Sequence, residues 1–229
     1  MLEKELRVIA VKRSGQHGII NWLLAQKPLC GNTVFLNNET LGAPTPCMGA
    51  EEILLSSYED TDISTEDEEL RLQTEAKELF YVLVMRDPFN LFASRLVWPW
   101  GKVVSKHLNR DNIGTLVRLW KVHAREYLGY TDYLPNKLCV SFNDWFKSKR
   151  YRRQLAKRFG LEFSDTGLNI VTSHGAGSSF DGIEFDGKAQ QMAVLRRYKK
   201  VESNPMYNAV FMEDEELMAL SDAIFKLGY

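Results

Sequence analysis

The sequence predicts an α/β protein whose mainly parallel central sheet is covered by helices on both faces. Leu6–Val11 (LRVIAV) and Phe80–Met85 (FYVLVM) are nearly continuous apolar runs, as expected for central strands that are buried on both sides. Segments with helical spacing of apolar residues lie between such runs. Because strands that alternate with helices form right-handed crossovers, this order favours a three-layer architecture.

The other elements follow the same alternation. Two further strands are expected over Thr33–Asn37 and Lys137–Phe142. Helices are expected over the segment that contains Ile19, Leu23 and Leu24, over residues 64–79, from Asp87-Pro88 onward, over Asn112–Leu134, over Lys147–Arg158, and through Leu217, Leu220, Ile224 and Leu227.

Charge is unevenly distributed along the chain. Residues 51–78 are strongly acidic and are interpreted as a solvated helix and loop on the surface. The basic segment Lys147–Arg158 is interpreted as a solvated helix face, with contact to an anionic ligand as the alternative. His123 falls on the apolar face of its helix, which indicates a packed core histidine.

Length and composition indicate an ordinary soluble protein with one domain over residues 1–229. The net charge of −1 gives no reason to expect a nucleic-acid partner. Cys30, Cys47 and Cys139 lack metal-ligand spacing and indicate reduced thiols. No signal peptide or membrane span is visible, so we expect a cytoplasmic protein; the oligomeric state stays open.

The loop RSGQHG (Arg13–Gly18) joins the first strand to the first helix, which continues with Ile19. Backbone N–H groups at a helix N-terminus bind anions, and glycine lets the backbone approach them closely. A nucleoside-triphosphate loop would need G-x-x-x-x-G-K-[ST], whose hydroxyl holds magnesium, and this loop has no such pattern. It therefore predicts a phosphate or sulfate site that needs no metal.

A second stretch, RDPFNLFAS, repeats the layout of strand, arginine and helix. Arg86 follows the strand at the sheet edge where open α/β sheets bind ligands, and Ser94 lies about two turns into the next helix. An arginine and a hydroxyl eight positions apart can hold one phosphate from two sides.

With these two motifs the chain resembles the sulfotransferases that use 3′-phosphoadenosine 5′-phosphosulfate (PAPS). In that family a [KR]-S-G-x-[ST] loop binds the 5′-phosphosulfate. An R-[DN]-P motif, with serine eight residues after the arginine, binds the 3′-phosphate. The matching segments here are RSGQH and RDPFNLFAS. The resemblance implies a P-loop NTPase-like sulfotransferase fold and adenosine 3′,5′-bisphosphate (PAP) as product. It also implies metal-independent, in-line transfer of a sulfuryl group.

The resemblance also assigns the donor-binding residues. They are Arg13, Ser14, Gly15, Gln16, His17, Gly18 and Ile19 in the first loop, Arg86 and Ser94 in the second motif, and Ser178 and Ser179 in a later loop. That later loop, Gly175–Gly182, precedes the basic segment RRYKK and is similar to the loop that closes over the nucleotide in many members. The chain departs from the family where Gln16 and His17 replace the usual hydroxyl residues.

The catalytic roles that the resemblance implies are less tightly assigned. Arg13 would stabilise charge on the bridging oxygen of the leaving group, with Lys12 ranked second. Glu39 and His107 are the candidates for the base that deprotonates an acceptor hydroxyl or amine, and a residue not singled out in the sequence stays a third alternative. The acceptor is a small molecule or a carbohydrate.

Two other functions remain open from the sequence. One is a nucleotide or small-molecule kinase with a degenerate P-loop, against which the missing G-K-[ST] counts. The other is a non-catalytic nucleotide-binding module, in which Gln16 and His17 mark the loss of turnover.

Overall fold

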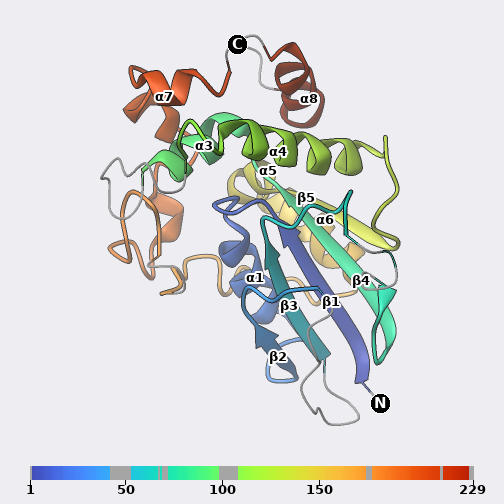
Figure 1. Ribbon diagram of the computed structural model, residues 1–229. Coiled ribbons are helices and arrows are strands. Elements are labelled where there is room, and N and C mark those ends of the chain that lie inside the picture. Colours follow the sequence, from blue (N-terminus) through green and yellow to red (C-terminus); the bar gives the residue numbers. More distant parts are fainter. Residues whose placement is uncertain are drawn as a thin grey trace.

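Five parallel strands form one central sheet in a computed structural model, which describes residues 2–41, 53–66, 68, 72–97, 108–173, 177–211 and 214–226 (Figure 1). The order across the sheet is β2-β3-β1-β4-β5, and all four pairings are parallel. The strands are β1 (Leu2–Ala10), β2 (Thr33–Leu36), β3 (Ile53–Glu59), β4 (Ala76–Met85) and β5 (Lys137–Ser141). The predicted parallel sheet is thereby confirmed.

Helices cover both faces of the sheet. They are α1 (Gln16–Leu24), α3 (Pro88–Leu96), α4 (Ile113–Leu128), α5 (Phe142–Lys147), α6 (Lys149–Arg158), α7 (Pro205–Asn208) and α8 (Glu215–Phe225), with 3-10 turns η2 (Ala189–Gln191) and η3 (Arg197–Lys200). In β1, Val8 packs with α1, α5 and α6, whereas Ile9 packs with Val122 of α4 on the opposite face. Helix α8 packs against the outer side of α4 (Figure 1). The three-layer prediction is confirmed.

The acidic segment 51–78 was interpreted wrongly. It contains β3, in which Leu54, Leu55 and Tyr58 are buried, and β3 pairs along its length with β1. The strand is short, and the acidic residues on both sides of it dominate any charge count over the window. The helix expected over residues 64–79 is also wrong at its end, because β4 begins at Ala76. The polar residues there lie on the exposed start of β4, where Lys77 pairs with Glu3 at 2.6 Å.

Helix boundaries differ from the expected ones for local reasons. Helix α4 ends at Leu128 because Gly129 adopts a left-handed conformation (φ 77°) and caps it. The basic segment does not form one helix, since Ser148 ends α5 and its side chain caps α6 by accepting from the Tyr151 amide. Most basic side chains of α6 are exposed, but Arg152 is buried and pairs with Asp165 at 2.8 Å.

Other predictions from the sequence are confirmed. Asp87 caps α3 by accepting a hydrogen bond from the Asn90 amide at 2.8 Å, and Pro88 occupies the first turn. His123 is fully buried, and its Nε2 lies 2.8 Å from the carbonyl oxygen of Thr61. Among the described helices, none combines the length and apolarity needed to cross a bilayer.

Strand register brings the carboxyl ends of three strands together. Ala10 of β1 lies opposite Glu59 of β3 and opposite Val84 of β4. The loop after β1 therefore emerges between the residues that follow β3 on one side and Arg86 on the other. This is the sheet edge at which parallel α/β proteins bind their ligands.

Candidate anion-binding site

The loop after β1 makes a tight turn into α1. The Ser14 amide donates to the Val11 carbonyl at 3.0 Å, and both Arg13 (φ 74°) and Gly15 (φ 84°) are left-handed. A Cβ atom on Gly15 would lie 2.3 Å from Cε2 of Phe142. Glycine is therefore required at this position both by the backbone conformation and by the ring that packs against it.

The turn opens into a cavity of about 410 Å³. Its lining comprises residues of the β1–α1 loop, of the segments after β2 and β3, of α5, and of two later segments around residues 168–179 and 189–197. Gly15, Gln16, His17 and Gly18 at the start of α1 are among the lining residues. The amide groups of a first helical turn have no partner within their own helix, so this wall is suited to an anion.

Arg86 forms the floor of the cavity and is almost completely buried. Its guanidinium donates to the Arg13 carbonyl at 2.9 Å, to the Val194 carbonyl at 2.5 Å and to the Ser94 hydroxyl at 3.3 Å. It also lies over the Phe142 ring, 5.1 Å from the centroid. The two residues predicted from the second motif are thus in contact, and Arg86 also holds the loop of the first motif.

Arg197 is a second buried arginine at this site, and the sequence did not single it out. Its Nη1 donates to the Ser94 hydroxyl at 3.3 Å, and its Nη2 donates to the Ser178 hydroxyl at 2.5 Å and to Asp181 at 3.1 Å. Its backbone amide donates to the side-chain oxygen of Asn90 at 2.8 Å, which orients it. The segment RRYKK showed basic character, but only the fold distinguishes buried Arg197 from exposed Arg196.

Three arginines at this site have lowered pKa values, because burial disfavours their charged forms. Burial, and then the nearby charge of Arg197, lowers the pKa of Arg86 to about 9, although Asp87 opposes the effect. Burial also lowers the pKa of Arg197, against the opposing charge of Asp181. Burial lowers the pKa of Arg13 to about 10, with Glu59 opposing this effect and Arg95 and Arg197 adding to it. An anion bound among these groups would offset their mutual repulsion.

Several buried polar atoms around the cavity have no hydrogen-bond partner within the part of the chain that the structure describes. They are Gln16 Oε1, Arg86 Nε, Ser179 Oγ and Arg197 Nε, all on residues that line the cavity. Buried polar groups in folded proteins are nearly always hydrogen-bonded, so four such atoms around one cavity indicate a polar ligand. Ser178 and Ser179 both line the cavity, and the Ser178 hydroxyl accepts from Arg197 and donates to Asp181 at 2.9 Å.

An ion pair between buried Arg95 and half-buried Asp60 supports the start of the loop. Arg95, the residue after Ser94, donates to both carboxylate oxygens of Asp60 at 2.8–2.9 Å. Asp60 accepts the Lys12 amide at 2.8 Å, and Arg95 donates to the Lys12 carbonyl at 3.3 Å. The pair therefore fixes the backbone where the loop begins, and neither residue carried a signal in the sequence.

The residues that depart from the family pattern are tied to the neighbouring strands. Gln16 Nε2 donates to Glu59 at 2.8 Å, and His17 Nε2 lies 2.7 Å from Asn37 Oδ1. Glu59 also pairs with Lys12, whose Nζ lies 3.4 Å away, and its side chain is 11% exposed at the cavity wall. Sequence reasoning missed Glu59 because it missed β3, at whose end this residue lies.

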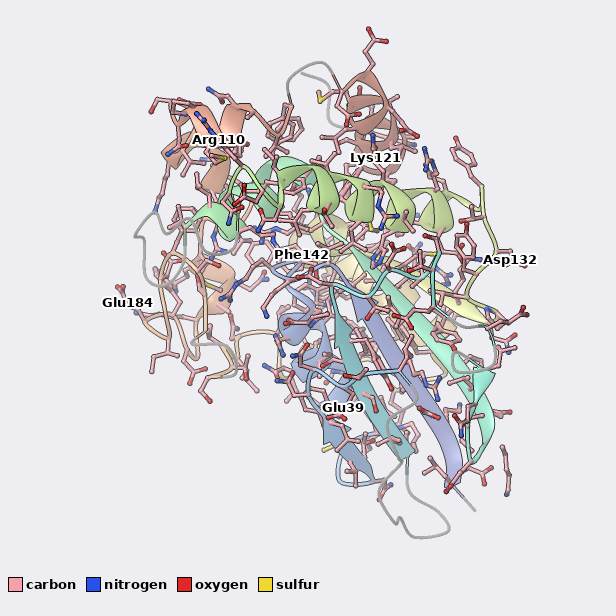
Figure 2. The ribbon with its side chains drawn as sticks, in the orientation of Figure 1. Glu39, Arg110, Lys121, Asp132, Phe142 and Glu184 are labelled. Carbon is pink, nitrogen blue, oxygen red and sulfur yellow. The ribbon has the colours of Figure 1, made fainter. Side chains whose placement is uncertain are left out.

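The remaining candidates lie elsewhere. Glu39 is not part of the cavity lining; its amide donates to the Ser57 carbonyl at 2.8 Å, and Figure 2 shows it well away from Phe142. Ile19 is fully buried in the core beneath the loop. His107 and Cys47 lie outside the described residues. Within the described residues, no cluster of three or more His, Cys, Asp or Glu side chains could hold a metal.

Comparison with known proteins finds a likeness in structure but none in sequence. No family model matches the chain, and no curated protein matches its sequence. Among solved structures, the chain is similar to mouse sulfotransferase SULT7A1 complexed with PAP. The TM-score is 0.46 at 7% sequence identity, over 97% of this chain and 90% of that chain. A likeness at this level carries no argument about activity.

Proposed function

We propose that the chain is a PAPS-dependent sulfotransferase that moves a sulfuryl group to a hydroxyl or amine acceptor without a metal. One observation carries the proposal: Arg86 and Arg197 both donate to the Ser94 hydroxyl beside the N-terminus of α1. The two guanidinium groups offer charge-assisted hydrogen bonds to a phosphate beside the Ser94 hydroxyl, which itself donates to the Asn90 carbonyl at 2.8 Å. The helix terminus offers backbone amides to a second anion of the same ligand.

The donor would be held at two anion subsites. We assign the 3′-phosphate to Arg86, Ser94 and Arg197, and the 5′-phosphosulfate to the loop Ser14–Gly18 with Arg13. The unpartnered Nε atoms of both buried arginines and the unpartnered Ser179 hydroxyl support this fit, because a phosphate-rich ligand supplies acceptors for them. When bound, PAPS supplies an activated sulfuryl group on a phosphate leaving group.

Two residues are assigned to the chemical step. Arg13, at the end of β1, stabilises the negative charge that develops on the leaving oxygen. Glu59 takes the proton from the acceptor, because its carboxylate lies on the cavity wall and is oriented by Gln16 and Lys12. Glu39 and His107 remain alternative candidates for the base. The ion pair between Asp60 and Arg95 positions the loop but contacts no reacting group in this scheme.

The test separates this proposal from a binding module and from a kinase. The protein is incubated with [³⁵S]PAPS in EDTA and with a mixture of sugars, phenols, steroid alcohols and amines, and PAP formation is followed. A sulfotransferase forms PAP and a labelled acceptor without metal. A binding module retains intact PAPS, and a kinase neither binds nor consumes it.

Glu59→Gln distinguishes the base from a structural role. The substitution keeps the size of the side chain and a hydrogen-bonding oxygen, so PAP should bind as it does to the unmodified chain. Turnover should fall by about 10²–10⁴-fold, the usual contribution of a general base. Unchanged turnover would exclude Glu59 as the base and return attention to Glu39 and His107.

A further inference from the structure

We propose that the acceptor is a saccharide, held by Asn37, Asn38 and Glu59 where the carboxyl ends of β2 and β3 border the cavity. All three residues line the cavity. The inference rests on the proposed function, because it names the acceptor class of the same site.

The sheet order separates two ends of the cavity. Strands β3 and β2 lie on one side of β1, whereas β4 and β5 lie on the other. Arg86 follows β4, and the aromatic residues Phe142, Trp145 and Phe146 follow β5. Arg86 and Ser94, the proposed ligands of the 3′-phosphate, and the aromatic wall are therefore on the β4–β5 side, the loop proposed for the 5′-phosphosulfate is central, and the β2–β3 side is left for the acceptor.

The two ends also differ in chemistry. On the β4–β5 side, Phe142 stacks on Phe146 with centroids 5.9 Å apart and packs against Trp145 at 5.8 Å. Leu168, Met192 and Val194 extend the apolar part of the cavity wall. On the other side the lining residues are Lys12, His17, Asn37, Asn38 and Glu59, all of them polar. An apolar acceptor would leave the Asn37 NH₂ group and the Asn38 side-chain amide without a ligand partner.

Hydrogen bonds fix the direction of the Asn37 amide. Ser57 Oγ accepts the Asn38 backbone amide at 2.9 Å, so the Ser57 hydroxyl hydrogen is free to donate to Asn37 Oδ1, 3.2 Å away. The same oxygen receives His17 Nε2 at 2.7 Å. Both contacts use the oxygen, and no other described residue accepts from Asn37 Nδ2. That NH₂ group is therefore available as a donor at the cavity.

Asn38 is held in a conformation that leaves its side chain available. Its backbone is left-handed (φ 58°), a conformation that asparagine tolerates, and Ser57 anchors its amide. The side chain is exposed at the cavity and has no hydrogen-bond partner among residues that the structure describes. It offers one acceptor and two donors to a ligand.

Two amides and a carboxylate match a ligand with several adjacent hydroxyls. Each sugar hydroxyl both donates and accepts, so neighbouring hydroxyls can pair with the Asn37 NH₂ group, the Asn38 amide and Glu59 at once. A phenol or a steroid alcohol has too few hydroxyls to pair with both asparagine amides at once. Sites built to hydrogen-bond a substrate hydroxyl reject analogues that lack it.

The test measures binding to the full chain saturated with PAP. Saturation-transfer NMR is recorded with a mixture of unsulfated mono-, di- and trisaccharides, 4-nitrophenol, a steroid alcohol and an alkylamine. We expect signals from one or more saccharides only. In Asn38→Gly, which keeps the left-handed backbone, the saccharide dissociation constant should rise by about tenfold, the effect of one lost hydrogen bond. The affinity for PAP should not change.

Asn136→Gly is the matched control. Asn136 is also exposed and left-handed (φ 51°), and it lies outside the cavity lining, so this variant should bind saccharide normally. If PAP binds and only the phenol, steroid or amine gives signals, the saccharide assignment is wrong and the proposed function stands. If PAP does not bind, the proposed function fails and this inference fails with it.

Discussion

Arg86 and Arg197, which come from distant parts of the sequence, both donate a hydrogen bond to the Ser94 hydroxyl at 3.3 Å. Burial lowers the pKa of both buried guanidinium groups, and the charge of Arg197 lowers the pKa of Arg86 further, so this arrangement around one neutral hydroxyl is electrostatically unfavourable. A bound phosphate would compensate both charges. This relationship underlies the first two predictions.

Removing Arg86 should distinguish the 3′-phosphate from the 5′-phosphate. In Arg86→Ala, PAP binding should weaken by roughly 1.5–3 kcal/mol, as expected for a lost charged hydrogen bond, while 5′-AMP binding scarcely changes. Calorimetry with both ligands measures the difference. Because Arg86 also supports the backbone at Arg13 and Val194, Ser94→Ala serves as a milder second variant with the same selectivity. Equal losses for both nucleotides would contradict the assignment.

Asp181 should compete with the ligand for Arg197. In the unliganded protein Asp181 supplies a negative partner to this buried arginine at 3.1 Å, so Asp181→Asn should lower the free energy of unfolding by about 1–3 kcal/mol. Saturation with PAP should recover most of the loss, since phosphate replaces the carboxylate. The thermal shift caused by PAP should therefore be larger in the variant than in the unmodified chain.

Asp132→Asn is the control for that comparison. Asp132 is an exposed aspartate that also pairs with a basic side chain, Lys137, but neither residue lines the cavity. This variant should change neither the stability nor the thermal shift. An Asp181→Asn variant with the same PAP-induced shift as the unmodified chain would show that Asp181 and the ligand do not share Arg197.

Gly15 should tolerate no side chain. Gly15→Ala introduces both a left-handed alanine and a Cβ that lies 2.3 Å from the Phe142 ring. Gly31 has a nearly identical φ of 83° but no heavy atom within 4 Å of an added Cβ. Gly31→Ala should therefore cost only the left-handed conformation, roughly 1–2 kcal/mol, whereas Gly15→Ala should cost more and should also weaken PAP binding. Chemical denaturation of both variants measures the costs, and equal values would argue against close packing on Phe142.

Buried His123 should make the fold sensitive to mild acid. Burial lowers the pKa of His123 below its ordinary value of 6.5, although the hydrogen bond to the Thr61 carbonyl opposes the effect. Below pH 6.5 the unfolded chain therefore binds a proton that the folded chain does not, and stability falls until the pH reaches the folded-state pKa. The slope reaches at most about 1.4 kcal/mol per pH unit.

His123→Gln should remove this dependence, because glutamine does not titrate and its Nε2 can still donate to Thr61. Between pH 7.5 and 5.5 the free energy of unfolding, measured by chemical denaturation, should change less with pH for the variant than for the unmodified chain. The same pH dependence in both proteins would mean that other groups govern acid sensitivity in this range.

The sequence allowed prediction of the elements whose pattern is local. Val8 and Ile9 lie in an apolar run that is buried on both faces, and Asp87-Pro88 is a helix start whose cap depends on neighbouring residues alone. The strand β3 was missed because flanking acidic residues outweighed its short apolar core. Glu59 was missed with it, since its place at the cavity follows from pairing with Ala10.

Arg197 could not be found for a different reason. Its burial depends on Asn90, a residue of α3 that holds its backbone amide, and on a loop that brings Asp181 to its side chain. Neither contact can be predicted from the sequence, because each joins residues that are distant along the chain or in separate loops. In contrast, Arg86 and Ser94 share one strand–helix unit, so their spacing already indicated that they would meet.

The protein should bind a 3′,5′-bisphosphate rather than a nucleoside triphosphate. Thermal unfolding with PAP, and with ADP or ATP in the presence and absence of magnesium, tests it most directly. PAP at about 100 times its dissociation constant should stabilise the fold by ~2.7 kcal/mol, or roughly 5–10 °C for a chain of this size, with EDTA present. A shift with magnesium-ATP alone would contradict the account and indicate a kinase.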